Sequence, residues 1–330
     1  MSMAALLASA FLAAQAPAPE LLGQWQAFRV RFVTDEGRVR DTGNEGASHS
    51  EGQAYAMLAA ASLGQRADFD RLWKWTTDHL GTRGDGLLAW RWDPETGKVA
   101  DANNATDGDL VAAWALLRAA RRWPTGGYQR DAARLLDAIE AHVVAASRMG
   151  PVLQPGVDGF RAADGLVVNP SYWVFPALEE IALARPAGPW RRIAGAGRKL
   201  LGEARFGPAG LPSDWVLLSR PVVPAPDRPP RFGYDALRIP LYACWSGATD
   251  LAVLDAVRRA WRSPAPPAWI DLASGETASW SLGPGGMAVR ALLDRCLGGD
   301  ARIPPPGDTP DYYDAILALL SAIAAREVAW

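Results

Sequence analysis

Residues 50–60, Ser-Glu-Gly-Gln-Ala-Tyr-Ala-Met-Leu-Ala-Ala, begin with a polar tetrapeptide and continue directly into small and apolar residues. A serine followed three residues later by glutamine, just before an apolar run, is typical of a capping box. In that motif the two side chains satisfy backbone N–H groups at a helix start. The pattern therefore predicts a helix over residues 51–63 and places Glu51 in its first turn.

Two further segments combine an acid with a helix start. Thr106-Asp107-Gly108-Asp109-Leu110 opens one apolar periodic run, and Gly233-Tyr234-Asp235-Ala236-Leu237-Arg238 opens another. Acids are common at helix N-termini because they complement the helix dipole, so each taken alone is more readily structural. Three carboxylates at three helix entrances can also converge on one site, and paired carboxylates are the usual equipment for glycoside hydrolysis.

Helical periodicity continues along nearly the whole chain, and it predicts an all-α fold. Strand signals are few and short, at residues 87–92, 152–153 and 216–218. With no break in composition, we expect a single domain over residues 17–330. The predicted helices cover residues 20–31, 51–63, 67–80, 107–122, 127–147, 170–183, 187–203, 235–246, 249–262, 284–297 and 309–326.

Composition excludes several classes of function. The 34 basic and 36 acidic residues leave a net charge of −2, which argues against a nucleic-acid surface or a polybasic membrane patch. The three histidines are scattered and no cysteine pair has metal-binding spacing, so we expect neither a metal site nor a cofactor. Cys244 and Cys296 can pair in an exported protein, or each can be an unpaired buried thiol, and both readings stay open.

Residues 1–16 are small and apolar and end in Ala14-Gln15-Ala16, which resembles a signal peptide with its cleavage site. The run is shorter than the roughly 20 apolar residues that a spanning helix needs, so we expect no stable membrane span. Export to the periplasm or the medium is the predicted location.

Five phrases follow one another along the chain in a recognisable order. They are SEGQAYAMLAA from Ser50, ATDGDLVAAWALL from Ala105, NPSYWVFPAL from Asn169, LPSDWV from Leu211 and YDALRIPLYACW from Tyr234. In wording, order and spacing they resemble glycoside hydrolase family 8, and within it the endoglucanases that accompany bacterial cellulose synthase. The resemblance covers about residues 20–325.

The resemblance implies an (α/α)6 barrel, with six inner helices ringed by six outer ones, and an inverting mechanism. It assigns Glu51 as general acid and Asp235 as general base, and it gives Asp107 the role of holding the sugar in a distorted ring shape. Asp109 is assigned instead to a capping box with Thr106. An inverting enzyme places a water between the base and the sugar, so its two carboxyls are expected about 6.5–9.5 Å apart.

The acid and the base need different pKa values. A general acid must keep its proton near neutral pH, so we expect apolar surroundings and a neighbouring carboxylate to raise the pKa of Glu51 above the effect of the helix dipole. Arg238 follows Asp235 by three residues, on the same face of the predicted helix. We expect its charge to favour the ionised form of Asp235.

Fifteen tryptophans are far more than ordinary usage. Sugar rings stack on aromatic planes through their flat C–H faces, although most tryptophans in any protein are packing residues. Trp90 and Trp92 alternate on a short segment, so both can face one side of a strand. The predicted substrate-binding residues are Trp90, Trp92, Tyr172, Trp173, Trp215, Tyr234 and Arg238.

These expectations combine into an exported, inverting endo-β-1,4-glucanase that cuts amorphous or nascent cellulose. The expected partners are the β-1,4-glucan chain and, by resemblance, the cellulose synthase complex; oligomeric state is not predicted. One alternative is the same chemistry on mixed-linkage glucan, chitosan or xylan. Another is a non-catalytic glycan-binding subunit of a polysaccharide export complex, against which the intact Glu51, Asp107 and Asp235 speak.

Overall fold

The computed structural model describes residues 18–305 and 307–328, and the predicted signal peptide at residues 1–16 lies outside this part of the chain. Within it, all eleven predicted helices are present. They are α2 (Pro19–Phe32), α3 (Ser50–Ser62), α4 (Arg66–His79), α5 (Thr106–Arg122), α6 (Tyr128–His142), α7 (Phe175–Ala184), α8 (Trp190–Glu203), α9 (Arg238–Trp245), α10 (Ala252–Ala260), α11 (Pro284–Cys296) and α12 (Tyr312–Glu327).

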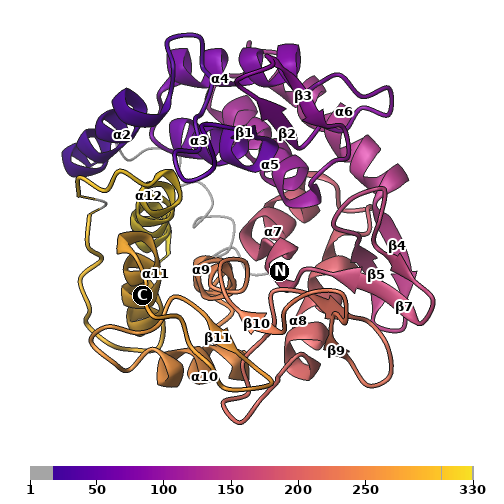
Figure 1. The fold of residues 1–330 in the computed structure, drawn as a ribbon. Coiled ribbons are helices and arrows are strands. Elements are labelled where there is room, and N and C mark those ends of the chain that lie inside the picture. The colour runs from indigo at the N-terminus through magenta and orange to yellow at the C-terminus, as the bar shows by residue number, and fades with distance from the viewer. Residues whose placement is uncertain (1–17, 306, 329–330) are drawn as a thin grey trace, which may run out of the picture.

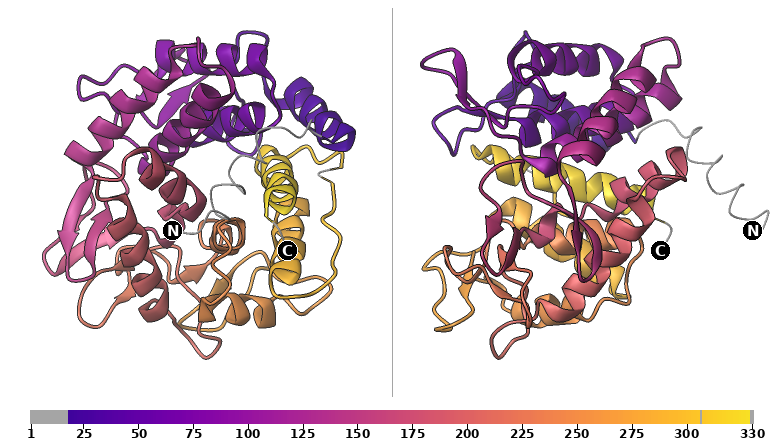
Figure 2. Two further views of the ribbon diagram at one scale, coloured as in Figure 1. Left: turned by 180° about the vertical axis from the view of Figure 1, so that it is seen from behind. Right: turned by 90° about the vertical axis from the view of Figure 1, so that its right-hand side faces the viewer.

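The helices form a closed ring around which the chain travels once (Figure 1). The inner helices α3, α5, α7 and α9 contact one another in that order, and α12 closes the ring by contacting both α9 and α3. The other helices pack around them, for example α4 against α3, α6 against α5 and α8 against α7. In the side view, many of the connecting loops extend from one end of the ring (Figure 2). This is the architecture of an (α/α)6 barrel, as expected.

Sequence pattern separates the inner helices from the outer ones. In α3, every residue from Gly52 to Ala61 is buried, and α5 is buried from Thr106 to Leu117, so these helices are covered on all sides. The outer helix α10 is amphipathic, with Val253, Leu254 and Val257 inward and charged residues outward. A helix that is apolar all round belongs in a core, whereas an amphipathic helix covers one. A single core cluster takes buried residues from all eleven helices.

Two helices depart most from their predicted bounds. The helix expected over residues 127–147 ends at His142, and the rest of that segment forms β4 (Val144–Ser147), which pairs with β5 (Gly150–Leu153) in an antiparallel hairpin. Residues 170–172 form a short 3-10 helix, η1 (Pro170–Tyr172), and α7 starts only at Phe175, next to Pro176. β-branched residues after His142 favour a strand, and proline favours the first helical turn.

Short strands occupy the loops. β1 (Ser48–His49) pairs with β2 (Arg91–Asp93), which pairs with β3 (Lys98–Asp101). A second sheet joins β6 (Arg161–Ala162), β7 (Gly165–Val168), β8 (Val216–Leu217) and β9 (Val223–Pro224). β10 (Arg231–Phe232) pairs with β11 (Ile270–Asp271). The predicted segments 152–153 and 216–218 correspond to β5 and β8, whereas most of segment 87–92 is not a strand and the other short strands were not predicted.

Both predicted capping boxes are wrong. The residue before α3 is His49, so Ser50 is already helical, and no side chain caps the helix. Gln53 instead accepts the backbone N–H of Val39 at 2.5 Å and donates to the hydroxyl of Thr76 at 2.9 Å. A long-range packing contact has therefore taken the glutamine that the local motif would have used.

The two cysteines form a disulfide between α9 and α11, with their Cα atoms 5.6 Å apart. The sequence left their pairing open. The bond joins the helix that starts at Arg238 to its neighbour in the ring. In the described part of the chain, no helix is long and apolar enough to cross a membrane.

Candidate active site

The predicted acid, base and third carboxylate meet at one guanidinium. Arg238 donates from Nη1 to Glu51 and from Nη2 to Oδ1 of Asp235 at 2.7 Å. Oδ2 of Asp107 lies 3.6 Å from Nη1. Glu51 and Asp107 stand in the first turns of α3 and α5, and Asp235 lies in the turn before α9. The N-terminal ends of three inner helices thus converge, and their dipoles favour negative charge there.

Solvent access divides these groups into two pairs. The side chains of Glu51 and Asp235 are 23% and 29% exposed, whereas those of Asp107 and Arg238 are each 3% exposed. A substrate approaching from solvent can therefore meet the predicted acid and base directly. Of the buried pair, Arg238 bonds both of these carboxylates.

One positive charge cannot neutralise three carboxylates, so the pKa values of the three groups shift in different directions. Burial raises the pKa of Asp107 well above its usual range, and the charge of Glu51 and a hydrogen bond with it raise it further. Burial also raises the pKa of Glu51, but the charge of Arg238 and hydrogen bonds with Asp107 and Arg238 outweigh it, so this pKa is lowered. The expected rise in the pKa of Glu51 is wrong, because Arg238 bonds Glu51 as well as Asp235.

The pKa of Asp235 is raised, and the main cause is burial. Arg238 lowers it as expected, as do the side chains of Asn169 and Trp215, but together they do not overcome the burial. The expected effect of Arg238 on Asp235 is present, but burial and the charge of Glu51 outweigh it, so the net pKa is raised. The predicted helical register is wrong, since α9 begins at Arg238 and Asp235 precedes it in a turn.

Several polar residues that sequence reasoning did not single out hold Arg238 in place. Ser171 accepts a hydrogen bond from Nη2 at 3.0 Å and donates to Oδ1 of Asn169 at 2.7 Å. Tyr55 accepts from Nη1 at 3.3 Å, and its hydroxyl also bonds that of Tyr242. All four belong to three of the phrases quoted above, at positions that gave no chemical signal of their own.

Aromatic side chains surround the carboxylates. Trp90 is half-buried and stacks on His49, two residues from Glu51, with ring centroids 5.5 Å apart. Tyr172 lies with its ring centroid 6.0 Å from the Arg238 guanidinium, and it meets Trp215 edge to face. Trp90, Tyr172 and Trp215 therefore remain candidates for sugar contact.

Trp173 departs from the prediction, and Trp92 packs half-buried against a neighbouring helix. Trp173 is 1% exposed, and its indole N–H donates to the backbone oxygen of Ile193 at 2.9 Å, so it is a packing residue. Trp92 packs edge to face against Trp75 of α4, at 5.5 Å between centroids. A register irregularity between Arg91 and Trp92 interrupts the strand, so simple alternation does not apply to Trp90 and Trp92.

A group of exposed rings lies beside the base. Tyr234 is 52% exposed and Trp280 is 53% exposed, and the Trp280 indole N–H donates to the Tyr234 hydroxyl at 3.2 Å. Tyr313 of α12 donates to the backbone oxygen of Tyr234 at 2.6 Å. Tyr234 was predicted; Trp280 and Tyr313 were not, and neither lies in one of the five quoted phrases.

Asp109 has a structural place, although not the predicted one. Its carboxylate accepts from the backbone N–H of Leu88 and from the amide of Asn104, each at 2.9 Å. Thr106 donates to the backbone oxygen of Gln154 instead of capping α5. Burial raises the pKa of Asp109 to about 7.

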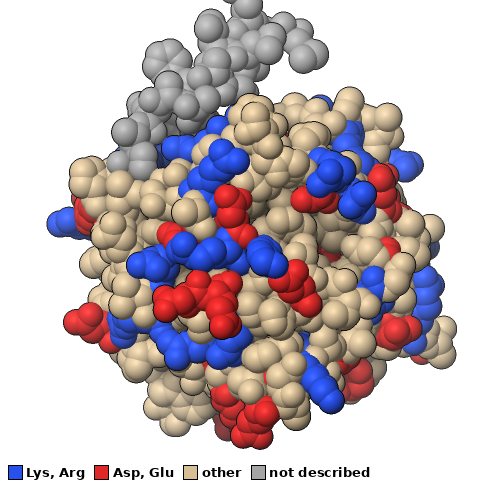
Figure 3. Space-filling view, turned by 90° about the horizontal axis from the view of Figure 1, so that it is seen from above, with Lys and Arg blue, Asp and Glu red and all other residues tan. Residues whose placement is uncertain are grey.

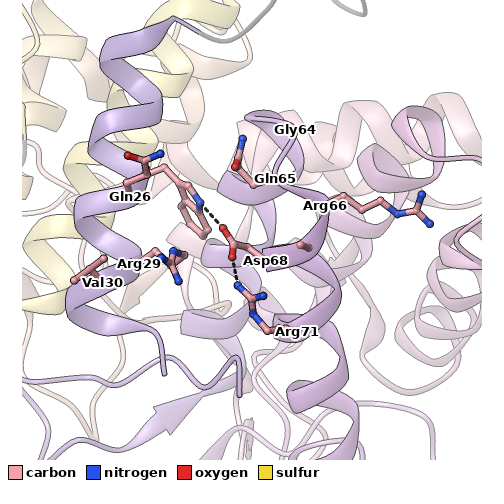
Figure 4. Close-up of a pocket in the computed structure, with 10 residues that line it drawn as sticks. Gln26, Arg29, Val30, Gly64, Gln65, Arg66, Asp68 and Arg71 are labelled. Carbon is pink, nitrogen blue, oxygen red and sulfur yellow. Dashed lines mark hydrogen bonds and ion pairs between the residues drawn. The ribbon is translucent and has the colours of Figure 1, made fainter. Parts of the chain in front are cut away.

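The described residues also line a pocket away from these carboxylates. A pocket of about 590 Å³ between α2 and α4 is lined by Trp25, Arg29, Asp68 and Arg71 among others, and Asp68 is already bonded to Trp25 and Arg71 (Figure 4). On the face seen in Figure 3, basic and acidic side chains are interspersed. No cluster among the described residues has the composition of a metal site.

Comparison with known proteins identifies the family of this chain. The model for glycosyl hydrolases family 8 matches residues 1–327. The chain belongs to glycosyl hydrolase family 8. It is therefore a glycoside hydrolase.

Individual relatives cover most of the chain. A probable endoglucanase of Novacetimonas hansenii is 40% identical over 325 residues, covering 94% of this chain and 93% of that protein. An endoglucanase of Cellulomonas uda is 39% identical over 275 residues, covering 81% and 76%. The structure of the endo-β-1,4-glucanase CMCax from Acetobacter xylinum superimposes with a TM-score of 0.86 at 38% identity, covering 93% of this chain and 98% of the other.

Proposed function

We propose that this family 8 hydrolase is an inverting endo-β-1,4-glucanase that cuts amorphous or nascent cellulose. The observation that carries the proposal is the pair of solvent-reaching carboxylates, Glu51 and Asp235, bound to opposite nitrogens of the buried Arg238. Relatives described as endoglucanases, similar along most of their length, support the choice of polymer.

In the proposed reaction, a water attacks the anomeric carbon while the bond to the leaving oxygen breaks. Asp235 takes a proton from that water, and Glu51 gives a proton to the leaving oxygen, so that charge is balanced. The raised pKa of Asp235 makes it a better proton acceptor. The proton that Glu51 and Asp107 share is the one we assign to the leaving group.

Asp107 is placed to help in a different way. It is buried beside the acid, and its Oδ1 accepts the backbone N–H of Gly108 at 2.9 Å. We propose that it steadies the distorted sugar at the point of cleavage. Trp90, Tyr172, Trp215 and Tyr234 are proposed to bind neighbouring sugars through their ring faces.

We also propose that the enzyme works outside the cytoplasm, where its substrate is a glucan chain trimmed during cellulose synthesis. The Cys244–Cys296 disulfide supports the location, because such bonds persist in oxidising compartments. The resemblance of the quoted phrases to endoglucanases that accompany cellulose synthase supports the role.

Digestion of cellohexaose, with the first products followed by NMR, tests bond type, endo action and stereochemistry together. Internal cleavage with α-anomers appearing first is expected. First-formed β-anomers would contradict inversion, and binding of cellohexaose without cleavage would favour the non-catalytic glycan-binding subunit. Parallel assays on carboxymethyl cellulose, lichenan, chitosan and xylan would reassign the polymer if both β-glucans were left intact.

A further inference from the structure

The turn that carries Asp235 rests on another carboxyl. Oδ1 of Asp214 accepts the backbone N–H of Gly233 at 2.9 Å and that of Ala236 at 2.8 Å. These two donors lie on either side of Asp235. A Cβ added at Gly233 would stand 2.7 Å from Oδ2 of Asp214, so the absence of a side chain there permits the close approach.

The residue next to Asp214 contacts the same base. The Trp215 side chain lowers the pKa of Asp235, and its ring stacks on Phe160 with centroids 5.8 Å apart and planes 6° apart. The backbone N–H of Asp214 also donates to the backbone oxygen of Arg231 at 2.6 Å, just before the Gly233–Leu237 turn. Asp214 thus bonds the backbone around Asp235, and its neighbour Trp215 contacts the Asp235 carboxyl.

We propose that Asp214 is a positioning residue for catalysis, which fixes the Gly233–Leu237 turn and adjusts the proton affinity of Asp235 through its own charge. The inference rests on the proposed function. No substrate contact is assigned to Asp214, which acts through Asp235.

The charged surroundings support an electrostatic part in addition to a mechanical one. Burial raises the pKa of Asp214 to about 7, and the charge of Asp235 raises it further, while Arg238 lowers it. Besides Asp214, four ionisable groups from other elements face Asp235. They are Glu51 of α3, Asp107 of α5, Tyr172 of η1 and Tyr313 of α12. Of these groups, Asp214 and Tyr313 also bond the turn that carries the base, Tyr313 through the backbone oxygen of Tyr234 and Asp214 through two backbone N–H groups.

The two halves of the proposal separate in two variants. Asp214→Asn retains a side-chain oxygen for the two N–H groups and removes the charge, whereas Asp214→Ala removes both. We expect Asp214→Ala to lower kcat on cellohexaose by about 100-fold, the effect of a 1 Å misplacement, with KM within about 2-fold. Asp214→Asn should recover most of that loss. Asp314→Asn is the matched control, because Asp314 likewise accepts a backbone N–H, that of Gly285.

A measurement without substrate keeps the inference independent of the glucanase proposal. In protein carrying ¹³C-carboxyl aspartate, the Asp235 resonance, assigned by its loss in Asp235→Asn, should show a second step near pH 7 as Asp214 ionises. That step should vanish in Asp214→Asn and persist in Asp314→Asn.

Three results would overturn the inference. They are wild-type kcat in a folded Asp214→Ala, a loss of kcat that merely follows the unfolded fraction, and an Asp235 titration that Asp214→Asn leaves unaltered. An inactive wild-type protein would overturn the proposed function instead, and the titration would still test Asp214.

Discussion

Arg238 lies between three carboxylates, and its single charge decides how they share their protons. It lowers the pKa of Glu51, the predicted acid, whereas burial and the charge of Glu51 raise the pKa of Asp107 well above its usual range. In the proposed reaction, this keeps the proton for the leaving group beside Glu51, in a buried position.

Glu51→Gln tests the proposed acid. We expect kcat on cellohexaose to fall by about 10²–10⁴-fold, because the amide cannot donate a proton to the leaving oxygen. Release of reducing ends measures the loss, and circular dichroism checks the fold. Glu36→Gln, on an exposed turn, should leave activity unchanged. Full activity in Glu51→Gln would remove the assignment.

Two tryptophans give opposite expectations. Trp90→Ala should raise KM for cellohexaose by about 2- to 12-fold, since an aromatic contact is worth about 0.5–1.5 kcal/mol, with little change in Tm. Trp173→Ala should instead lower the free energy of unfolding by about 3–5 kcal/mol, because it empties a buried site. Steady-state kinetics and urea unfolding of both variants separate the roles. A stable Trp173→Ala with a raised KM would contradict the assignment of Trp173 as a packing residue.

At the scale of elements, the starts of α3 and α5 are held by side-chain contacts from outside the first turn instead of by local caps. α3 is anchored through Gln53, and α5 through Asp109, whose partners lie in the segment before β2 and in the loop before α5. Such contacts fix where each helix begins relative to its neighbours. They therefore fix where Glu51 and Asp107 meet.

Asp109 predicts a pH dependence of stability. Its folded pKa of about 7 lies above the ordinary 3.8, so the unfolded chain releases this proton first as the pH rises. Its contribution to stability is complete below about pH 4 and is lost progressively up to about pH 7. Asp109→Asn should flatten that part of the curve of unfolding free energy against pH, measured with urea. An identical slope in both proteins would contradict the raised pKa.

The disulfide constrains α9 and α11. It closes a loop over a sequence separation of 52 residues, which corresponds to about 4 kcal/mol of lost unfolded-state entropy. Wild-type protein should lose Tm on addition of dithiothreitol, whereas the double variant Cys244→Ala, Cys296→Ala should begin at the lower Tm and not respond. If mass spectrometry shows that the disulfide is reduced and the Tm of the wild type is unchanged, the bond does not stabilise the protein as expected.

For the whole molecule, closure of the ring depends on a largely buried ionic network that lies away from Glu51, Asp107 and Asp235. Arg118 of α5 bonds Glu180 of α7 and Glu327 of α12, and the Trp245 indole of α9 also donates to Glu327. The network joins four inner helices, including the last in the chain. The charges of Arg118 and Arg121 lower the pKa of Glu180 despite its burial.

Arg118→Met should therefore destabilise the whole barrel. We expect a loss of about 3–5 kcal/mol in unfolding free energy, because two carboxylates lose their buried partner. Glu180→Gln in the same background should recover part of it. Urea unfolding measures stability, and kcat at low temperature should stay near wild type, since Arg118 lies far along α5 from Asp107. Equal stability of Arg118→Met and wild type would contradict the role of the network.

Local pattern was enough to place all eleven described helices and to find the three acids. It was less successful where distant groups compete. Gln53 left its capping box for Thr76 and Val39, and residues 144–147 formed a hairpin instead of extending α6. Trp173 looked like its neighbour Tyr172, yet only one of the two is buried, because the 3-10 turn points them differently.

By itself, the sequence determined the helical class, the order of the helices and the identities of Glu51, Asp107 and Asp235, since periodicity and motif wording are properties of neighbouring residues. Only the tertiary structure decided that these acids share Arg238, that burial raises the pKa of Asp107, that Asp214 bonds the turn carrying Asp235 and that the cysteines pair. Burial and Coulomb interactions depend on distance through space, and the groups concerned are separated by up to 187 residues along the chain.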